Sequence, residues 1–382
     1  MREISEENKP KILFFITKSV WGGAQKYVYD LSTDLELQKK YHTIVALGGT
    51  GILSEKLAAE NIEIINAKYL KNTLNPITLF YSIIENIKII RNVKPEIVHT
   101  NSSFAGLSIG FACLLLRQKS VFTVHGWPQN EDRNLFMKIT LGQCMAAVVL
   151  FHSKYISVSK KVLQQTPKLF GILSLKRKGK VIYNGIKKLT PKSFDEIFKL
   201  NKEVINIVTI GELHSNKNYP LVLAALEKLP EDLSWNYHII GDSLGDDSEK
   251  QKLHKLIIQN KYSDKIFMHG FVKDAAQYLE NFDIFVLGSI TESFGFVLAE
   301  AGLAKIPCIA THVGGVPEVI DTQVNGLIVE SQNIIQMKHA IEKLITDENL
   351  RLEYGEKFYT KVVENFSYEK MINETIVLYE KV

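Results

Sequence analysis

Short apolar runs alternate with longer segments of helical spacing along almost the whole chain, and this alternation restricts the folds open to it. In the first half, strands are expected at residues 11–17, 42–47, 62–65, 96–100, 120–124 and 155–159. In the second half, they are expected at 204–210, 236–240, 265–268, 283–287, 307–310 and 326–329. This pattern is typical of parallel sheets with helices on both faces. Because 382 residues exceed what one core usually supports, we predict an α/β chain with two doubly wound, Rossmann-like domains.

The boundary between the two domains is predicted in the segment 191–202, which is polar and charged and lacks a strong hydrophobic period. We therefore expect domains at 1–190 and 203–365, followed by a C-terminal helix over 366–382. Within the first domain, an amphipathic helix is expected at 76–91. One apolar stripe of this helix is expected to lie in the core, formed by Leu79, Ile83, Ile84, Ile87 and Ile90.

Charge is distributed unevenly between the two halves. Residues 1–190 carry 27 Lys and Arg against 13 Asp and Glu, whereas residues 191–382 carry 19 against 29. A basic half joined to an acidic half suggests that the basic half faces a polyanion, either an anionic membrane surface, a lipid pyrophosphate or nucleic acid. Nucleic acid ranks last because the lysines are dispersed and no nucleic-acid module is present. A solvated basic surface without a partner remains the alternative.

Cysteine use indicates a reducing compartment, and the N-terminus shows no evident secretion signal. Cys113, Cys144 and Cys308 are odd in number and lack metal-ligand spacing, so free thiols are expected. The start, 1–9, is polar and acidic and does not resemble a secretion signal. The longest nearly apolar runs are shorter than the roughly 18 residues that suggest a membrane span. We expect a cytoplasmic protein, soluble or peripheral on the inner face of the membrane.

The stretch 288–319 combines a strand, a polar loop and a helix in the order that forms an anion site. Backbone N–H groups of Ser293, Phe294 and Gly295 would lie at the start of the helix, where a partial positive charge favours a phosphate. Glu292 and Glu300 frame this position and could accept hydrogen bonds from sugar or ribose hydroxyls. A Gly-Gly loop at 314–315 could bring further backbone amides close to the same ligand.

Two places in the first half have a related arrangement. Gly22 and Gly23 follow the first strand and open a helix expected over 26–37, which is a weak anion-site signal by itself. His125 ends another strand and precedes a glycine, at the carboxyl edge where ligands of such sheets bind. A single His at a strand end is more often structural than catalytic, so the pattern alone leaves both interpretations open.

The region of Glu292 also resembles a known family. The spacing of Glu292 and Glu300, followed by Ala301, Gly302, Pro307, Ala310, Thr311, Gly314, Gly315 and Glu318, is similar to the signature of the retaining glycosyltransferases of family 4. The resemblance implies the GT-B fold, in which two Rossmann-like domains face each other across a cleft. It also implies a nucleotide-sugar donor such as a UDP- or GDP-sugar, held by the second domain, and an acceptor held by the first. The C-terminal helix is then expected to pack back on the first domain.

The resemblance assigns roles to individual residues. His125 would contact the donor sugar, Gly22 and Gly23 the acceptor or the transferred sugar, and Asn184 would lie in the Asn-Gly turn that closes the first domain. After Gly211 the family usually has Arg, and Lys six residues past that Gly. This chain has Glu212 and Lys217. Lys217 would neutralise the donor diphosphate, and Glu212 is a departure from the pattern.

The expected chemistry follows from these groups. His125, Lys217 and Glu292 form the predicted catalytic set. Donor binding is assigned to Gly211, Glu212, Ser293, Phe294, Gly295, Glu300, His269, Gly270 and Phe271, the last three as candidates for the base pocket. The sequence has no Asp-x-Asp motif or His/Cys cluster, so neither a metal nor another cofactor is expected. The resemblance predicts a retaining transferase that acts on a saccharide or lipid-linked acceptor in cell-surface polysaccharide or glycolipid synthesis. A soluble acceptor and a non-catalytic nucleotide-sugar binder are the alternatives.

Overall fold

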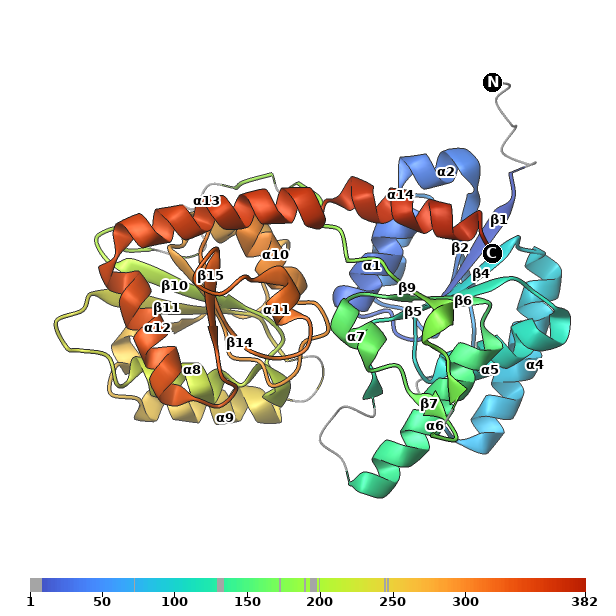
Figure 1. Ribbon diagram of the computed structural model, residues 1–382, viewed down its shortest axis with the longest axis horizontal. Coiled ribbons are helices and arrows are strands. Elements are labelled where there is room, and N and C mark those ends of the chain that lie inside the picture. Colours follow the sequence, from blue (N-terminus) through green and yellow to red (C-terminus); the bar gives the residue numbers. More distant parts are fainter. Residues whose placement is uncertain are drawn as a thin grey trace. The chain divides into compact units, whose positions relative to one another are not determined.

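A computed structural model describes residues 9–382, except for 72, 129–133, 172, 189, 193–197, 199, 244 and 246. The predicted polar start at 1–9 therefore lies almost entirely outside the described residues. The chain forms two compact units, one of residues 1–184 with 369–382 and one of residues 185–368. Each unit contains a parallel sheet with helices packed against it (Figure 1).

The first unit is built on a seven-stranded parallel sheet with the order β3-β2-β1-β4-β5-β6-β9. Residues on β1 pair with both neighbours, for example Phe14 with Val45 on one side and with His99 on the other. The strands are β1 (Lys11–Ile16), β2 (His42–Leu47), β3 (Glu63–Asn66), β4 (Ile97–Thr100), β5 (Ser120–Val124), β6 (Lys154–Ser157) and β9 (Gly179–Val181). A small antiparallel hairpin, β7 (Lys168–Leu169) with β8 (Leu173–Ser174), stands apart from the sheet.

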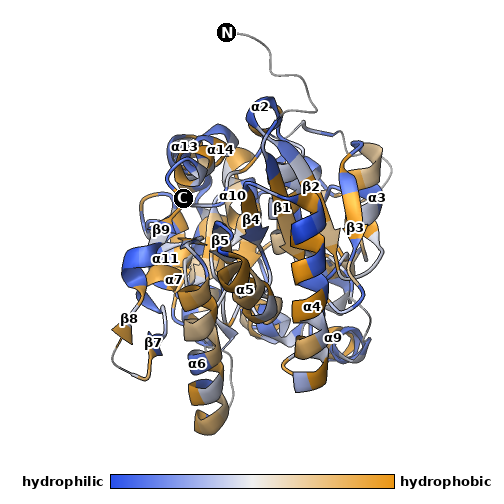
Figure 2. Ribbon diagram, turned by 90° about the vertical axis from the view of Figure 1, so that its right-hand side faces the viewer, coloured by the Kyte–Doolittle hydropathy of each residue, from blue (hydrophilic) through white to orange (hydrophobic). Residues whose placement is uncertain are grey.

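Helices connect these strands and cover both faces. They are α1 (Gly23–Ser32), α2 (Leu35–Lys40), α3 (Ile52–Ala59), α4 (Pro76–Val93), α5 (Ala105–Leu116), α6 (Leu135–Phe151) and α7 (Lys160–Gln164). The strand order runs one way from β1 to β3 and the other way from β4 to β6. Because parallel crossovers are right-handed, α4, α5 and α6 lie on one face and α1 and α3 on the other. Figure 2 looks onto the face with α4, α5 and α6.

Two sequence expectations about helices in this unit were wrong. The helix expected at 26–37 is two helices, because Asp34 interrupts it and caps α2 by accepting a hydrogen bond from the backbone N–H of Leu37 at 2.9 Å. The apolar stripe expected in the core from α4 is mostly only half-buried or exposed. The face of α4 that packs inward carries Ser82, Asn86, Ile90 and Val93 instead. Ser82 and Asn86 are tolerated there because both make hydrogen bonds to Ser108 of α5.

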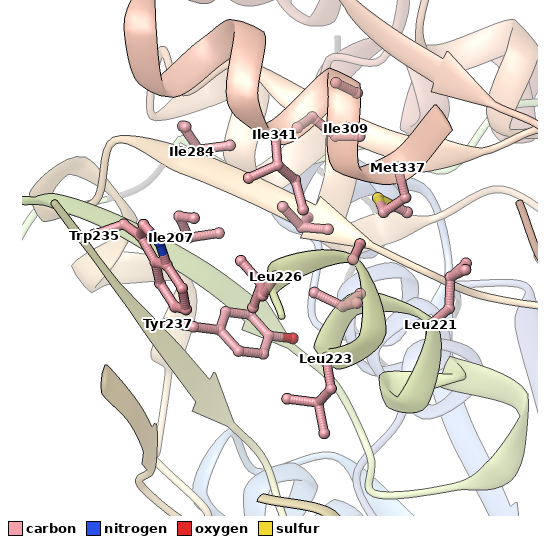
Figure 3. Packing of buried hydrophobic residues seen from close by; sticks show 14 of the residues in the cluster. Ile207, Leu221, Leu223, Leu226, Trp235, Tyr237, Ile284, Ile309, Met337 and Ile341 are labelled. Atoms are coloured by element: carbon pink, nitrogen blue, oxygen red, sulfur yellow. The ribbon is translucent and has the colours of Figure 1, made fainter. Parts of the chain in front are cut away.

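The second unit has a six-stranded parallel sheet with the order β12-β11-β10-β13-β14-β15. Its strands are β10 (Ile205–Ile210), β11 (Trp235–Ile240), β12 (Ile266–Met268), β13 (Ile284–Leu287), β14 (Cys308–Thr311) and β15 (Gly326–Val329). Its helices are α8 (Tyr219–Leu226), α9 (Ser248–Gln259), α10 (Phe296–Leu303), α11 (Val316–Val319), α12 (Ile334–Thr346) and α13 (Glu348–Asn365). Figure 3 shows one side of the core, where Tyr237 and Trp235 of β11 pack with Leu226 of α8 and Ile341 of α12.

The last helix, α14 (Tyr368–Tyr379), belongs almost entirely to the first unit. The Tyr379 hydroxyl lies 2.5 Å from Nδ1 of His99 on β4, and the Tyr379 ring meets Tyr41 edge to face. The change of unit occurs after Asn184, several residues before the expected boundary at 190. The reason is that Ile186 pairs with Ser367 and its N–H donates to the Phe366 carbonyl, both in the second unit. In the part of the chain described, every helix is too short or too polar to cross a membrane.

Candidate functional site

The second unit changes its winding direction between β10 and β13, and two polar loops meet there. From β10 the chain proceeds to β11 and β12 on one side, and from β13 to β14 and β15 on the other. The loops 211–218 and 288–295 follow these two adjacent strands at their carboxyl ends. Ligands of doubly wound sheets bind at such a position.

The Asn216 side chain joins the two loops. Its Nδ2 donates to the Thr291 carbonyl at 2.9 Å, while its Oδ1 accepts from the Thr291 N–H at 3.0 Å and from the Thr291 hydroxyl at 2.8 Å. The Ile290 N–H also donates to the Asn216 carbonyl at 2.8 Å. These bonds hold the loops in a fixed relation, so groups carried by both loops can act on one ligand.

Lys217 and Glu292, one from each loop, form an ion pair. Lys217 Nζ lies 2.5 Å from Glu292 Oε1, and the two side chains are only 20% and 13% exposed. The Ser289 hydroxyl donates to the same carboxylate oxygen at 3.1 Å. The Lys217 stem crosses over Gly211, where an added Cβ would lie 3.4 Å from Lys217 Cε. Sequence reasoning assigned both residues to the site but did not foresee that they pair with each other.

The start of α10 lies in the second of these loops, directly after Glu292. Gly295 has φ +89°, a left-handed conformation that favours glycine, and it precedes the first residue of the helix. Within the part of the chain that the structure describes, the backbone N–H groups of Ser293 and Gly295 donate no hydrogen bond. The Phe294 side chain is buried against Phe366, so only its backbone could reach a ligand. This is the geometry of an anion site at a helix N-terminus.

The Gly-Gly loop after β14 supports the Glu292 loop from behind. A Cβ at Gly314 would lie 1.5 Å from the Glu292 carbonyl oxygen, and one at Gly315 would lie 2.3 Å from that of Ser293. The Gly315 N–H donates to the Glu292 carbonyl at 2.9 Å. This N–H is therefore engaged with the loop rather than available to a ligand. These glycines permit the backbone contact that fixes Glu292.

Glu212 and Glu300 occupy different surroundings. Glu212 is exposed, and its backbone is anchored by the Tyr219 hydroxyl, which donates to the Gly211 carbonyl at 2.8 Å and lies 3.4 Å from the Glu212 carbonyl. Glu300 is half-buried on α10, whose far side packs closely on α13. A Cβ at Gly302 would lie 2.6 Å from Val362 Cγ2, so α10 is held firmly against α13 and its position is fixed.

His269, Gly270 and Phe271 follow β12 at the same edge of the sheet. The His269 ring stacks on His238 and meets Phe198 edge to face, with ring centroids 5.2 Å and 4.8 Å apart. Burial lowers the pKa of His269, so this ring is neutral at pH 7. Gly270 has φ +66°, and Phe271 is exposed.

Hydrogen bonds determine which nitrogen of His269 carries the proton. Asn206 uses Nδ2 as donor to the Asn201 and Val204 carbonyls, so its Oδ1 accepts from His238 Nε2 at 3.2 Å. His238 Nδ1 must then accept from His269 Nε2 at 2.9 Å. In this neutral tautomer, His269 Nδ1 is an acceptor that could bind a donor group on a ligand.

The first unit has its own change of winding direction, between β1 and β4. Gly22 precedes α1 in extended conformation, and a Cβ there would lie 3.1 Å from Gln25 Oε1. The Thr17 N–H, after β1, donates to the Ser102 hydroxyl, after β4, at 3.0 Å. Gly22 and Gly23 thus follow β1 at the carboxyl edge of the sheet. At this edge, the Ser102 hydroxyl connects the segment after β4 to the segment after β1.

His125 follows β5, the next strand along this edge. Its ring packs edge to face on Tyr27 at 5.0 Å, and burial lowers its pKa to about 4. Nε2 of His125 is buried and has no hydrogen-bond partner among the described residues. Because buried polar atoms are seldom left unsatisfied, this nitrogen is a candidate for contact with a ligand.

Two buried asparagines at the same edge share this property. Asn184, predicted as a site residue, is 2% exposed, and Asn101, directly after β4, is 3% exposed. Oδ1 of each lacks a hydrogen-bond partner among the described residues. Sequence reasoning missed Asn101, although its position immediately after a buried strand resembles that of His125 and could have identified it.

The structure thus groups the predicted residues into two sets, each within one unit. The second unit brings together Gly211, Lys217, Glu292, Ser293 and Gly295, with His269 further along the sheet edge. The first unit brings together Gly22, Gly23 and His125 at one edge, with Asn184 after its last strand. Among the described residues, no three His, Cys, Asp or Glu side chains are grouped so that they could hold a metal ion.

Comparison with known families agrees with this division. Residues 192–361 match glycosyl transferases group 1, and residues 21–188 match glycosyltransferase family 4. The two matches together span most of the chain. The chain therefore belongs to the family 4 type of glycosyltransferases, which have the GT-B fold, and the predicted family and fold are confirmed.

Individual relatives are distant but extensive. An uncharacterized glycosyltransferase of Methanocaldococcus jannaschii is 26% identical and covers 84% of this chain and 86% of its own length. The phosphatidylinositol N-acetylglucosaminyltransferase gpi3 subunit of Schizosaccharomyces pombe is 25% identical over 94% of this chain and 78% of its own. The structure of Anabaena HepE in complex with UDP-glucose has a TM-score of 0.83, 19% identity, and coverage of 97% of this chain and 100% of that chain. The structural likeness supports the fold.

Proposed function

We propose that this glycosyltransferase moves a sugar, with retention of configuration, from a nucleotide-diphosphate-sugar to a saccharide or lipid-linked acceptor. The donor site would lie in the second unit and the acceptor site in the first. The proposal rests on the arrangement of the loops that follow β10 and β13. There Lys217 pairs with Glu292, which directly precedes the start of α10, and the backbone N–H groups of Ser293 and Gly295 are available. The structure of Anabaena HepE in complex with UDP-glucose is consistent with this proposal.

In this proposal the diphosphate binds where Lys217 now pairs with Glu292. At about 4 Å and an effective dielectric near 20, one Lys charge attracts one phosphate charge by roughly 4 kcal/mol. The N–H groups of Ser293 and Gly295 add donors that need no reorganisation as charge develops on the leaving diphosphate. Glu292, displaced from Lys217 by the phosphates, would turn to the hydroxyls of the sugar, and Glu300 would bind the ribose.

Acceptor chemistry is assigned to the first unit. With its pKa near 4, His125 is neutral at pH 7 and can donate or accept one hydrogen bond at the transferred sugar. In a retaining reaction of this kind the leaving phosphate itself takes the proton of the acceptor hydroxyl. Charge stabilisation by Lys217 and backbone dipoles then suffices, and we propose that the reaction requires no divalent metal.

A panel of nucleotide sugars tests the donor assignment. Binding to the folded state alone raises the unfolding temperature, so UDP- and GDP-sugars should be compared by thermal shift with the matching nucleoside monophosphates as controls. We expect a larger shift with one diphosphate sugar than with its monophosphate. Equal shifts for both would contradict a diphosphate site at Lys217.

Transfer assays in excess EDTA then test the chemistry. We expect the rate with the best donor to be unchanged when metal is removed. A loss of transfer that Mg²⁺ or Mn²⁺ restores would refute metal independence. Donor binding without any transfer or hydrolysis would instead favour the non-catalytic binder.

The S. pombe relative, named for phosphatidylinositol, suggests a lipid acceptor for this chain as well, in polysaccharide or glycolipid synthesis. We therefore place the protein on the cytoplasmic face of a membrane, with a soluble acceptor as the alternative. The basic first half would face the anionic lipids. Transfer to lipid-linked and to soluble saccharides, compared with one donor, distinguishes the two acceptors.

A further inference from the structure

Over its first turns, helix α4 exposes apolar side chains to solvent and turns polar side chains toward the protein. The buried positions include Ser82 and Asn86, which make hydrogen bonds to Ser108 of α5. On the opposite side, Ile77, Phe80, Tyr81 and Ile84 form a stripe at helical spacing, and all four are exposed. A helix in water usually has the reverse arrangement. The exposed stripe of α4 therefore indicates a surface adapted to an apolar environment.

Helix α6 extends well beyond its neighbour at the same end. A Cβ at Gly106 of α5 would lie 2.9 Å from Val148 Cγ1, and one at Gly110 would lie 3.0 Å from Phe151 Cβ, so α5 packs on the last turns of α6. Helix α6 begins 13 residues before Val148. At 1.5 Å per residue, its start therefore lies about 20 Å beyond its contact with α5 at Val148. Figure 2 shows α4 and α6 reaching past α5 at this end.

The projecting part of α6 is apolar on its outside. Leu135, Phe136 and Ile139 are 73%, 77% and 56% exposed. The hairpin of β7 and β8 lies beside it, because the Phe170 N–H donates to Gln143 Oε1 at 2.7 Å. Phe170, at the turn of this hairpin, is 81% exposed. We call these side chains the apolar rim: Ile77, Phe80, Tyr81 and Ile84 of α4, Leu135, Phe136 and Ile139 of α6, and Phe170 and Leu173 of the hairpin.

An open groove continues this apolar surface between the helices. It has a volume of about 290 Å³ and lies between α4, α5 and the end of α6. Its lining is apolar except for Ser108, with Leu79, Ile83, Leu107, Phe111 and Phe151 as the other residues. The apolar rim is thus part of a larger apolar surface on this face of the first unit.

The charge around the apolar rim is positive. From 134 to 184, a stretch that includes α6 and the hairpin, the sequence has nine Lys and Arg residues and no Asp or Glu, although Lys178 lies at the far end of α6 and donates to the Val149 and Leu150 carbonyls. Lys138 lies on the projecting part of α6 and Lys168 in the hairpin, and Lys68 and Lys71 precede α4. The acidic Glu85 of α4 is engaged by the N–H groups of Lys68 and Tyr69, both at 2.8 Å. Glu131 and Asp132 lie outside the described residues.

We propose that the apolar rim inserts into the interfacial layer of an anionic lipid membrane. Apolar side chains flanked by lysines suit this layer, because the former enter the acyl boundary while the latter meet lipid phosphates. A second copy of the chain would place like positive charges opposite each other, whereas an anionic membrane would place negative charges opposite the lysines. Charge complementarity therefore favours lipid over a second copy. Both helices project beyond the carboxyl edge of the sheet, the edge at which Gly22, Asn101 and His125 lie. If the proposed function holds, a lipid-linked acceptor bound at the rim presents its head group to that edge.

Vesicle binding by the full-length protein tests this proposal without donor or acceptor. Wild-type protein should sediment with phosphatidylcholine vesicles that contain phosphatidylglycerol, less with pure phosphatidylcholine, and less again at high salt. A variant with Leu135→Ser, Phe136→Ser and Ile139→Ser should bind anionic vesicles at least tenfold more weakly. A second variant with Lys138→Glu and Lys168→Glu should lose the preference for phosphatidylglycerol. The control is Leu114→Ser with Leu115→Ser, which are 52% and 56% exposed at the other end of α5 and should bind as wild type does.

Several outcomes would overturn the proposal. These are equal binding to neutral and anionic vesicles, equal loss of binding in the control variant, or a wild-type dimer by light scattering that the α6 variant dissociates. The last would identify the rim as an interface between copies. Thermal unfolding and the thermal shift with nucleotide sugar, measured on every variant, separate this inference from the proposed function. If the protein binds vesicles but nucleotide sugar does not raise its unfolding temperature, only the proposed function is refuted. If nucleotide sugar raises the unfolding temperature but vesicles are not bound, only the membrane role of the apolar rim is refuted.

Discussion

This chain has Glu212 where the family usually has Arg, so Lys217 is the main cation expected at the diphosphate. Because Glu212 is exposed, it can stay away from the phosphates, and a carboxylate about 8 Å from a phosphate charge would repel it by only roughly 2 kcal/mol. We expect Lys217→Ala to lower kcat/KM at least tenfold, equivalent to about 1.4 kcal/mol of transition-state stabilisation, and Glu212→Ala to have little effect. Steady-state kinetics with the best donor measures both. If Glu212→Ala proves the crippling change, the diphosphate does not bind at this loop.

The pairing of Lys217 with Glu292 gives the two glutamates different signatures. Glu300→Gln should weaken the binding of free nucleoside diphosphate, because a ribose contact is lost. Glu292→Gln should lower turnover. It should also strengthen nucleotide binding, because the carboxylate that competes with the nucleotide for Lys217 is removed. Calorimetric titration of both variants with nucleoside diphosphate decides between these effects. Weaker binding in Glu292→Gln would show that Glu292 holds Lys217 in place for the phosphate instead of competing with it.

Among the elements, α14 is held by a buried chain of hydrogen bonds. The Thr123 hydroxyl donates to Tyr27 at 3.3 Å, so it accepts from His99 Nε2 at 2.7 Å, and His99 Nδ1 accepts from the Tyr379 hydroxyl of α14. Tyr379→Phe leaves that nitrogen buried without a donor, and we expect a loss of about 1–3 kcal/mol in the free energy of unfolding. Urea unfolding measures it. Tyr81→Phe, at an exposed position on α4, is the control and should change little.

Three histidines on and beside the first sheet, two of them fully buried, predict sensitivity to acid. Burial lowers the pKa of His99 to about 3, helped by the nearby His125 and His152, and lowers the pKa of the latter two to about 4. Each stays neutral in the folded state while its unfolded form takes up a proton below about pH 6.5. Stability is therefore full above that pH and falls as the pH is lowered toward 4.

The expected slope approaches about 1.4 kcal/mol per pH unit for each histidine. Urea unfolding between pH 7.5 and about 5 measures it in a range where most carboxylates remain ionised. His152→Gln should reduce the slope, since it removes one of the groups that take up a proton on unfolding. His238 and His269 of the second unit, whose pKa values burial also lowers, add to the slope in the same direction. A free energy of unfolding that is flat across this range would show that these side chains are protonated, or accessible to water, in the folded protein.

The strands were the most predictable elements, and the contacts between distant residues the least. The run 42–47 became β2 without a change of limits, because consecutive β-branched and apolar residues suit a buried parallel strand. The inward face of α4 could not be read from its own sequence, since Ser82 and Asn86 are buried only because Ser108 lies opposite. Asp34 did carry a local capping signal that would have divided the helix expected at 26–37.

The candidate site shows the same limit at a larger separation. Family resemblance placed Lys217 and Glu292 in one site, but their ion pair joins residues 75 positions apart and depends on how two loops meet. The role of Gly314 and Gly315 as support for the Glu292 backbone likewise needed the contact itself. Asn101 directly follows a buried strand, which made it a candidate, but the sequence alone does not show whether an amide at such a position is buried and unsatisfied or solvated.

For the whole molecule, the membership of α14 in the first unit affects any attempt to divide the chain. A break after Asn184, where the units separate, would deprive the N-terminal fragment of its last helix and leave His99 Nδ1 without its partner. That fragment should need the segment 369–382, supplied as a separate peptide, to fold fully. Both 1–184 and 369–382 must therefore be translated before the first unit is complete, so a ribosome stalled within the second unit would carry an unfinished first unit.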